Sequence, residues 1–254
     1  MKKFPSAFLA TVAALAAAST ALAGSTSASQ APVPPPESAE SSGLEIEAAI
    51  GYDSHYIFRG ELLQKNTPWA QLSLTVPLTE SLFFAVTPWY LHDMDDDYNE
   101  FDLNAGFLLS FGKYEFGLGY AGYYYPQGSL GAGEGIDDEQ EMIFSVSRDV
   151  GPASVTVMGT YSFTREAFYY ELAAELPYQL NDVVTIQPGV ALGWDSDYFA
   201  EGTGFNHLML SLSFPLKLSE HVELTPYIAG NFPFAQLGEL DDDLYGGVKL
   251  TVGF

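Results

Sequence analysis

The sequence predicts an all-β protein, a transmembrane antiparallel up-and-down β-barrel of twelve strands with both termini on the periplasmic side. Three observations predict it: a secretory signal, a closing segment of strict period-two alternation, and eleven further segments of similar pattern. In the closing segment every second residue is apolar or glycine, and the last is aromatic: Leu244, Gly246, Val248, Leu250, Val252 and Phe254. Such alternation buries one face of a strand. Only closed barrels let strands cross a bilayer without unpaired backbone groups.

The N-terminus carries the features of export. Lys2 and Lys3 precede an apolar run, and Ala21-Leu22-Ala23 supplies small residues at a cleavage site, so residues 1–23 are predicted to be a signal peptide. The apolar run is shorter than the roughly 20 residues of a transmembrane helix. Residues 24–43 are rich in Ser, Ala and Pro and predict a disordered leader. The barrel domain is therefore expected over residues 44–254.

Composition narrows the possible partners. The chain has 9 basic and 33 acidic residues, a formal net charge of −24. Nucleic acid is excluded as a partner, because phosphate binding needs positive charge. The absence of cysteine excludes disulfides, a lipid-modified N-terminal cysteine and cysteine metal sites. No cofactor is expected.

Twelve strands are expected, and they follow one another in this order: 44–58, 67–77, 82–92, 99–112, 113–125, 138–148, 153–163, 166–177, 183–195, 204–216, 222–232 and 243–254. Tight turns such as 79–81, 112–113 and 219–221 alternate with mostly longer, acidic or Gly-rich loops. This alternation is typical of bacterial outer-membrane barrels. Prolines at 77 and 88, 177 and 188, and 215 and 226 repeat one hairpin spacing, which predicts bulges or turn-adjacent positions.

The polar face of each strand should line the lumen, because an ionised carboxylate in hydrocarbon is costly. In residues 99–112, for example, Phe101, Leu103 and Phe107 share one face, which places Asp102 on the other. The same rule gives the full set of expected lumen residues: Glu45, Glu47, Asp53, Arg59, Asp102, Glu171, Glu175, Glu223 and Lys249. One interpretation is an acidic, cation-favouring pore. The alternative is a packed, non-conducting interior in which Arg59, Lys249 and Arg148 pair with these carboxylates.

Acidic clusters fall in the predicted external loops, at 93–100, 134–141, 195–201 and 239–243. Carboxylate clusters can share divalent cations and could bridge to lipopolysaccharide phosphates. The weak metal-ligand candidates are Asp93, Asp95, Asp97, Asp241, Asp242 and Asp243. The favoured interpretation is a solvated acidic rim. Asp93 does not begin an EF-hand, because the sixth position is Tyr98 and the twelfth is Asn104.

Enzymatic activity is not expected. The stretch 117–122 matches a dinucleotide-binding fingerprint by letter, but it continues as an alternating strand with no helix start. The four histidines are scattered, and no nucleophile elbow is present. His207, beside an external loop, is the one candidate base, and we interpret it as an ordinary wall or loop histidine.

The first strand carries a family resemblance. The stretch from Gly51 to Gly60 contains Tyr56-Ile57-Phe58-Arg59-Gly60 and resembles the opening strand of the TorF-type family of outer-membrane porins, which typically carries Tyr-x-Phe-Arg-Gly. The resemblance implies an outer-membrane barrel whose mouth is shaped by Tyr56, Phe58, Arg59 and Gly60, with Arg59 able to pair with inward carboxylates. The Pro-rich leader and the acidic loops depart from that family.

These observations together predict a porin of the bacterial outer membrane that passes small solutes with weak cation preference. The rival prediction is a non-conducting structural or interaction barrel whose acidic loops bind cations or a partner. Expected partners are outer-membrane lipid and lipopolysaccharide, small solutes, and the barrel-assembly machinery through the strand ending at Phe254.

Overall fold

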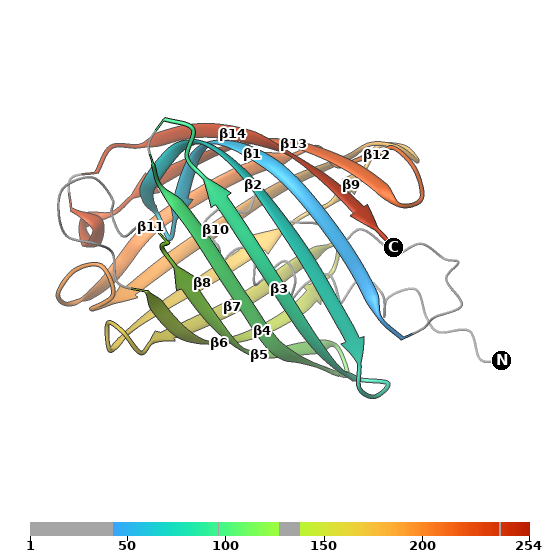
Figure 1. Cartoon of the computed structure of the whole chain (residues 1–254), viewed down its shortest axis with the longest axis horizontal. Coiled ribbons are helices and arrows are strands. Elements are labelled where there is room, and N and C mark those ends of the chain that lie inside the picture. The colour runs from blue at the N-terminus through green and yellow to red at the C-terminus, as the bar shows by residue number, and fades with distance from the viewer. Residues whose placement is uncertain (1–42, 96, 127–137, 239) are drawn as a thin grey trace.

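The computed structural model describes residues 43–95, 97–126, 138–238 and 240–254, and these form one antiparallel sheet closed into a barrel (Figure 1). The predicted signal peptide and leader, residues 1–42, lie outside the described residues. The strands are β1 (Glu45–Phe58), β2 (Glu61–Pro77), β3 (Leu82–His92), β4 (Asn99–Phe111), β5 (Tyr114–Tyr124), β6 (Glu139–Val150), β7 (Ala153–Ser162), β8 (Ala167–Glu175), β9 (Tyr178–Gln179), β10 (Thr185–Ser196), β11 (Thr203–Ser213), β12 (Leu216–Lys217), β13 (Val222–Pro233) and β14 (Asp243–Gly253).

The barrel has 12 strands, as the sequence predicts. The two-residue segments β9 and β12 continue β8 and β11 beyond Pro177 and Pro215. A proline cannot donate to the ladder, which explains why each strand is interrupted there. Two of the repeated prolines are therefore turn-adjacent ladder breaks, as predicted. Sequential neighbours pair throughout, and the pairing of β1 with β14 closes the barrel.

The outer surface is apolar and the inner surface polar. Along β4, Phe101, Phe107 and Leu109 are exposed, whereas the alternating Asp102 and Asn104 are buried. Exposed apolar side chains recur around the wall, including Ile50, Leu72, Leu118, Phe144, Val157, Leu172, Val190, Leu210, Ile228 and Val248. A soluble protein shows the opposite arrangement, and an apolar outer band with a polar interior is typical of transmembrane barrels.

Helices contribute almost nothing to the described residues. A short 3₁₀ helix, η2 (Ala235–Leu237), lies between β13 and β14. No helix in the described part of the chain has the length and apolarity needed to cross a membrane.

The first connection differs from its prediction. A loop was expected from 59 to 66, but β1 and β2 are joined by Arg59 and Gly60 alone. Both residues have positive φ, 50° and 88°, as a two-residue hairpin turn with the twist of its strands requires. The polar run before residue 67 stays a strand because it pairs with the end of β1, from His55 with Lys65 to Phe58 with Glu61.

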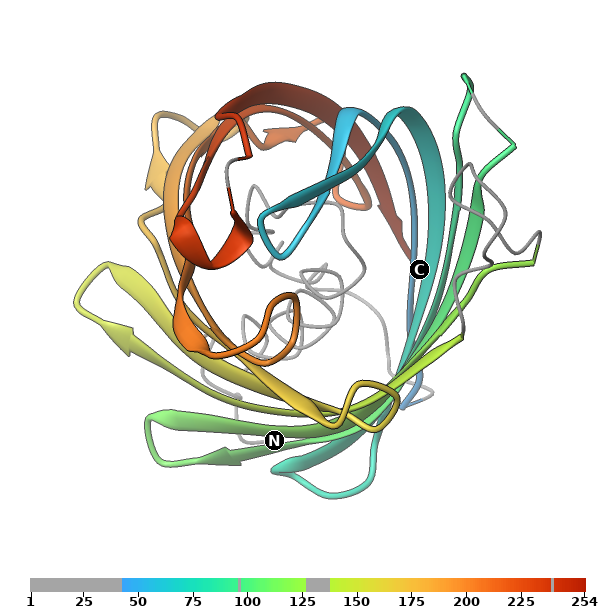
Figure 2. The same cartoon turned by 90° about the vertical axis from the view of Figure 1, so that its left-hand side faces the viewer.

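This hairpin extends beyond the barrel wall. The pairing of β1 with β14 ends at Asp53, and that of β2 with β3 begins at Trp69. Residues 54–66, which we call the ribbon, therefore pair only with each other in the described ladders. Figure 2 looks into the barrel from the end at the left of Figure 1 and shows the ribbon, in blue to cyan, bending over the opening.

Candidate functional site

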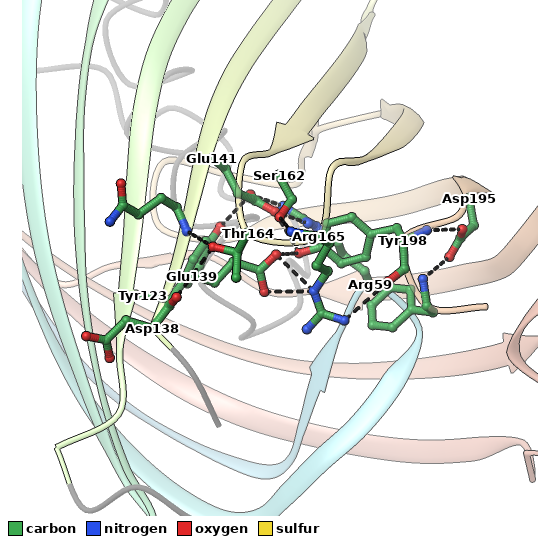
Figure 3. Close-up of polar contacts among 12 residues, drawn as sticks. Arg59, Tyr123, Asp138, Glu139, Glu141, Ser162, Thr164, Arg165, Asp195 and Tyr198 are labelled. Carbon is green, nitrogen blue, oxygen red and sulfur yellow. Dashed lines mark hydrogen bonds and ion pairs between the residues drawn. The ribbon is translucent and has the colours of Figure 1, made fainter. Parts of the chain in front are cut away.

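The ribbon tip is bound to the opposite wall by a buried ion pair. Arg59 donates from both terminal nitrogens to the two carboxylate oxygens of Glu141, each at 2.6 Å (Figure 3). Glu141 lies on β6, and β3, β4 and β5 separate that strand from the hairpin around the wall. The pair therefore spans the lumen. Bidentate arginine–carboxylate pairs are among the strongest hydrogen-bonded contacts in proteins.

Both partners of this pair are enclosed. Glu141 also accepts hydrogen bonds from Tyr198 at 2.6 Å and Tyr123 at 3.1 Å. Three aromatic rings surround the guanidinium carbon of Arg59, with centroids at 4.6 Å for Phe58, 4.7 Å for Tyr198 and 4.9 Å for Tyr169. Removing one partner of such a buried pair typically costs about 3–5 kcal/mol, because the other charge is left without compensation.

Arg59 stays charged in this environment. Burial alone would lower the pKa of its guanidinium, but the adjacent Glu141 carboxylate raises that pKa well above its ordinary value. The ion pair is therefore present wherever Glu141 is ionised.

A second ion pair, beside the Arg59–Glu141 pair, connects the β7–β8 turn and the β10–β11 loop to β6. Arg165, in the β7–β8 turn, donates from Nε to both carboxylate oxygens of Glu139 at 3.0 Å (Figure 3). Its Nη1 donates to the backbone carbonyl of Tyr198 at 3.2 Å, and the Tyr198 hydroxyl lies 2.7 Å from Glu139, so the two glutamates share its single proton. Asp195 accepts the backbone N–H groups of Tyr198 and Phe199. The β10–β11 loop is thereby fixed against β6.

The sides of the ribbon are also bound. Tyr56 donates to Glu100 on β4 at 2.8 Å, and Tyr98 donates to the same carboxylate oxygen. On the other side, Asn231 of β13 donates to the Gly60 carbonyl at 2.8 Å. The ribbon is thus connected to both halves of the wall.

The predicted lumen residues divide into two groups. Arg59, Asp53, Asp102 and Glu171 lie near the ribbon, where Asp102 is buried beside Glu100 and Glu171 accepts from Tyr169 at 2.9 Å. The second group lies toward the short turns, where Lys249 is in electrostatic reach of Glu47, Glu175 and Glu223. Glu45 is exposed at the end of β1. The lining of a pore by these residues stays a prediction.

Several site residues were missed because the acidic clusters were assigned to solvated loops. Glu100, Glu139, Glu141 and Asp195 are instead buried on the inner faces of strands. The sequence does contain a pattern that indicates this burial. Glu139 and Glu141 alternate with Gln140, Met142 and Phe144, which are exposed on the other face of β6. The part of the second cluster at 134–137 lies outside the described residues.

Arg148 is not an interior partner. It lies on the exposed face of β6 and donates to the Tyr114 hydroxyl at 2.9 Å, with its guanidinium 5.1 Å from that ring. The prediction that Arg148 pairs with interior carboxylates was wrong. Alternate residues of β6 point to opposite faces, and Arg148 shares its face with the exposed Phe144 and Val146.

Three of the six weak metal candidates have internal partners. Asp93 accepts the backbone N–H of Asp95 at 2.6 Å, Asp95 accepts from Asn66, and Asp243 lies 3.4 Å from His55. In the described residues no group of three or more His, Asp or Glu side chains could hold a metal ion. His207 is buried, with its ring parallel to that of Tyr169 at 6.5 Å, and it packs against Gly60.

Comparison with known proteins gives a family. Residues 37–213 match the model of a family described as bacterial protein of unknown function, Gcw_chp. The chain belongs to the Gcw_chp family. No curated protein matches this Gcw_chp member.

Two solved structures share the barrel fold of this chain. The KdgM porin has 11% identity and a TM-score of 0.51, covering 83% of this chain and 99% of the porin. An outer membrane channel from Pseudomonas putida F1 has 10% identity and a TM-score of 0.54, covering 87% of this chain and 100% of that channel. At these identities the likeness concerns the fold, and it agrees with the predicted barrel.

Proposed function

We propose that this Gcw_chp barrel is a bacterial outer-membrane porin through which small solutes diffuse passively, with a weak preference for cations. One observation carries the proposal: a closed barrel whose outer face is apolar encloses a face lined by ionisable side chains. An apolar band requires lipid, and charged interior groups need water or paired charges.

The resemblance of Tyr56-Ile57-Phe58-Arg59-Gly60 to the TorF-type porins supports the same function. These residues form the ribbon tip at the lumen opening. The porin and channel folds of the two solved neighbours are further support. We propose that the outer face of the barrel contacts lipid and lipopolysaccharide. We also propose that the barrel-assembly machinery binds the strand ending at Phe254.

The proposed cation preference follows from the balance of charge inside. On the inner face of the described strands, carboxylates outnumber cationic side chains, and Arg59 and Arg165 are each matched by a glutamate. Lys249 faces three glutamates. Rings of carboxylates favour cations in water-filled pores.

Single-channel conductance of the refolded full-length protein in planar bilayers tests the proposal, with a salt gradient to measure ion selectivity. We expect steps whose reversal potential has the sign of cation preference. The preference should fall in the E171Q/E175Q variant and stay unchanged in E220Q, an exposed turn residue. Folded barrels without steps, both in the unmodified protein and in a variant whose ribbon is released, would refute the porin.

A second candidate function is a non-conducting structural or interaction barrel. The observation that favours it is the ribbon, which lies over the opening and is bound to opposite walls. Conductance of a variant with a released ribbon separates the two candidates, because a porin would conduct once the ribbon leaves.

A further inference from the structure

We propose that the ribbon, residues 54–66, is the movable gate of this channel and that the Arg59–Glu141 ion pair is its latch. The inference rests on the proposed porin function and adds its regulation. In the open state the ribbon moves away from the barrel opening as a unit, and its base stays in the wall.

The ribbon can move because no neighbouring strand holds its edges. Within the described ladders, β14 pairs with β1 only as far as Asp53, and β3 pairs with β2 only from Trp69 onward. A two-stranded hairpin alone is marginally stable in water. Its position over the lumen therefore depends on side-chain contacts.

The geometry of the base suits a hinge. Asn66 has a positive φ of 56°, and its carbonyl accepts the backbone N–H of Met94 at 3.2 Å. Its side chain contacts Tyr52 and Asp95. Above this anchor the pairing shifts register between Tyr56 and Ile57, a bulge that bends the ribbon. The anchor stays with the wall while the bulged part turns.

The latch makes closure depend on two charges. Arg59 forms its ion pair with Glu141 across the lumen, and its Nε has no hydrogen-bond partner among the described residues. Loss of either partner leaves the other charge buried without its ion-pair partner, so the tip is expected to move out to water. An apolar pair of similar size could replace both charges and keep the ribbon closed.

Three apolar side chains make the closed position the resting one. Tyr56, Ile57 and Phe58 are buried against different parts of the wall: Trp89 and Tyr98, Ala229 and Tyr245, and Tyr123 and Tyr169, respectively. Opening exposes all three together, which makes it a cooperative transition between two states.

The first test compares single and double variants in planar bilayers. R59Q and E141Q are expected to show steps at least twofold larger or more often open than the unmodified channel. The double variant R59M/E141M is expected to return toward native behaviour. R148Q and E220Q are the matched controls, because Arg148 and Glu220 lie on exposed surfaces away from the ribbon. Heat-modifiable migration on gels confirms that each barrel is folded.

The second test locks the gate. The chain contains no cysteine, so R59C/E141C can be joined by a reducible bifunctional thiol reagent about as long as the two native side chains. Cross-linking should suppress the enlarged steps of this variant, and reduction should restore them. R59C alone, treated with the same reagent, controls for modification without bridging.

The outcomes separate the two proposals. Steps that are equal in the unmodified channel, R59Q and E141Q would overturn the gate and leave the porin intact. Folded barrels that never conduct, including E141Q, would overturn both the gate and the porin. Larger steps in the single variants that the cross-link suppresses would support both.

Discussion

Tyr227 on β13 reaches past β14 to donate a hydrogen bond of 2.5 Å to Asp53 on β1, and Gly247 lies in the row between them. Trp69 donates to the other oxygen of the same carboxylate at 2.8 Å. Gly247 permits this crossing, since a Cβ there would collide with Asp53 and with the Tyr52 carbonyl. This row joins three strands directly below the ribbon.

G247A is therefore expected to destabilise the barrel by about 1–3 kcal/mol, because the added methyl displaces packed groups. Urea unfolding in lipid vesicles, followed by tryptophan fluorescence, measures the change. G253A on the same strand is the control, because a Cβ there meets nothing within 4 Å. Equal midpoints for the two variants would contradict this account of the row.

D53A should lower stability by about 1–3 kcal/mol, because the buried Trp69 indole N–H loses its acceptor. The fluorescence of Trp69 should also change, since the carboxyl group beside its ring is gone. The same urea titration measures both effects. D182A, in an exposed turn, should behave like the unmodified protein; a native emission spectrum in D53A would count against the hydrogen bond.

K249Q should strengthen cation preference. Lys249 faces Glu47, Glu175 and Glu223, so removing its charge makes this part of the lumen more negative. A unit charge acting over about 8 Å of water contributes about 0.5 kcal/mol, roughly a twofold change in the permeability ratio. Reversal potentials in a salt gradient report this ratio. An unchanged ratio would show that Lys249 does not face the ion path, and K113Q, in an exposed turn, is the control.

R165Q should loosen the β10–β11 loop without unfolding the barrel. The Arg165 side chain is 39% exposed, so its ion pair with Glu139 contributes about 0–1 kcal/mol. Cleavage by chymotrypsin after Tyr198 or Phe199 should accelerate by up to about fivefold, while the urea midpoint changes little. R148Q is the control, and unchanged cleavage in R165Q would place the stability of this loop elsewhere.

Deletion of Phe254 should reduce assembly in cells more than stability in vitro. The ring is exposed at the end of the wall, and its backbone N–H donates to Ile46 at 2.9 Å. We expect a smaller heat-modifiable fraction in outer-membrane preparations and near-native refolding in detergent. F254Y retains the aromatic ring and is the control. Normal assembly of the deletion variant would remove Phe254 from the proposed contact with the assembly machinery.

The sequence predicted the wall well because strand alternation is a local property. The opposite orientations of Phe101 and Asp102 can be predicted from the alternation within their own strand, without knowledge of any other strand. Turn positions followed for the same reason, as in the tight turn at Gly112, where φ is 66°.

The site was harder to predict because it depends on closure of the barrel. Arg59 and Glu141 are 82 positions apart, and no local pattern pairs them. The polar residues at Gln64, Lys65 and Asn66 resemble a loop, yet they form a strand because the end of β1 lies beside them. Tertiary pairing overrides local preference there.

The pairing of β1 with β14 also determines when this protein can fold. Residues Glu47 to Asp53 find their partners in Gly247 to Gly253, which are synthesised long after them. Until β14 has been made, the edge of β1 presents unpaired backbone N–H and C=O groups, which can pair with strands of other molecules. The barrel can therefore close only after both strands have been synthesised, and β1 must keep its free edge away from other strands until β14 reaches it.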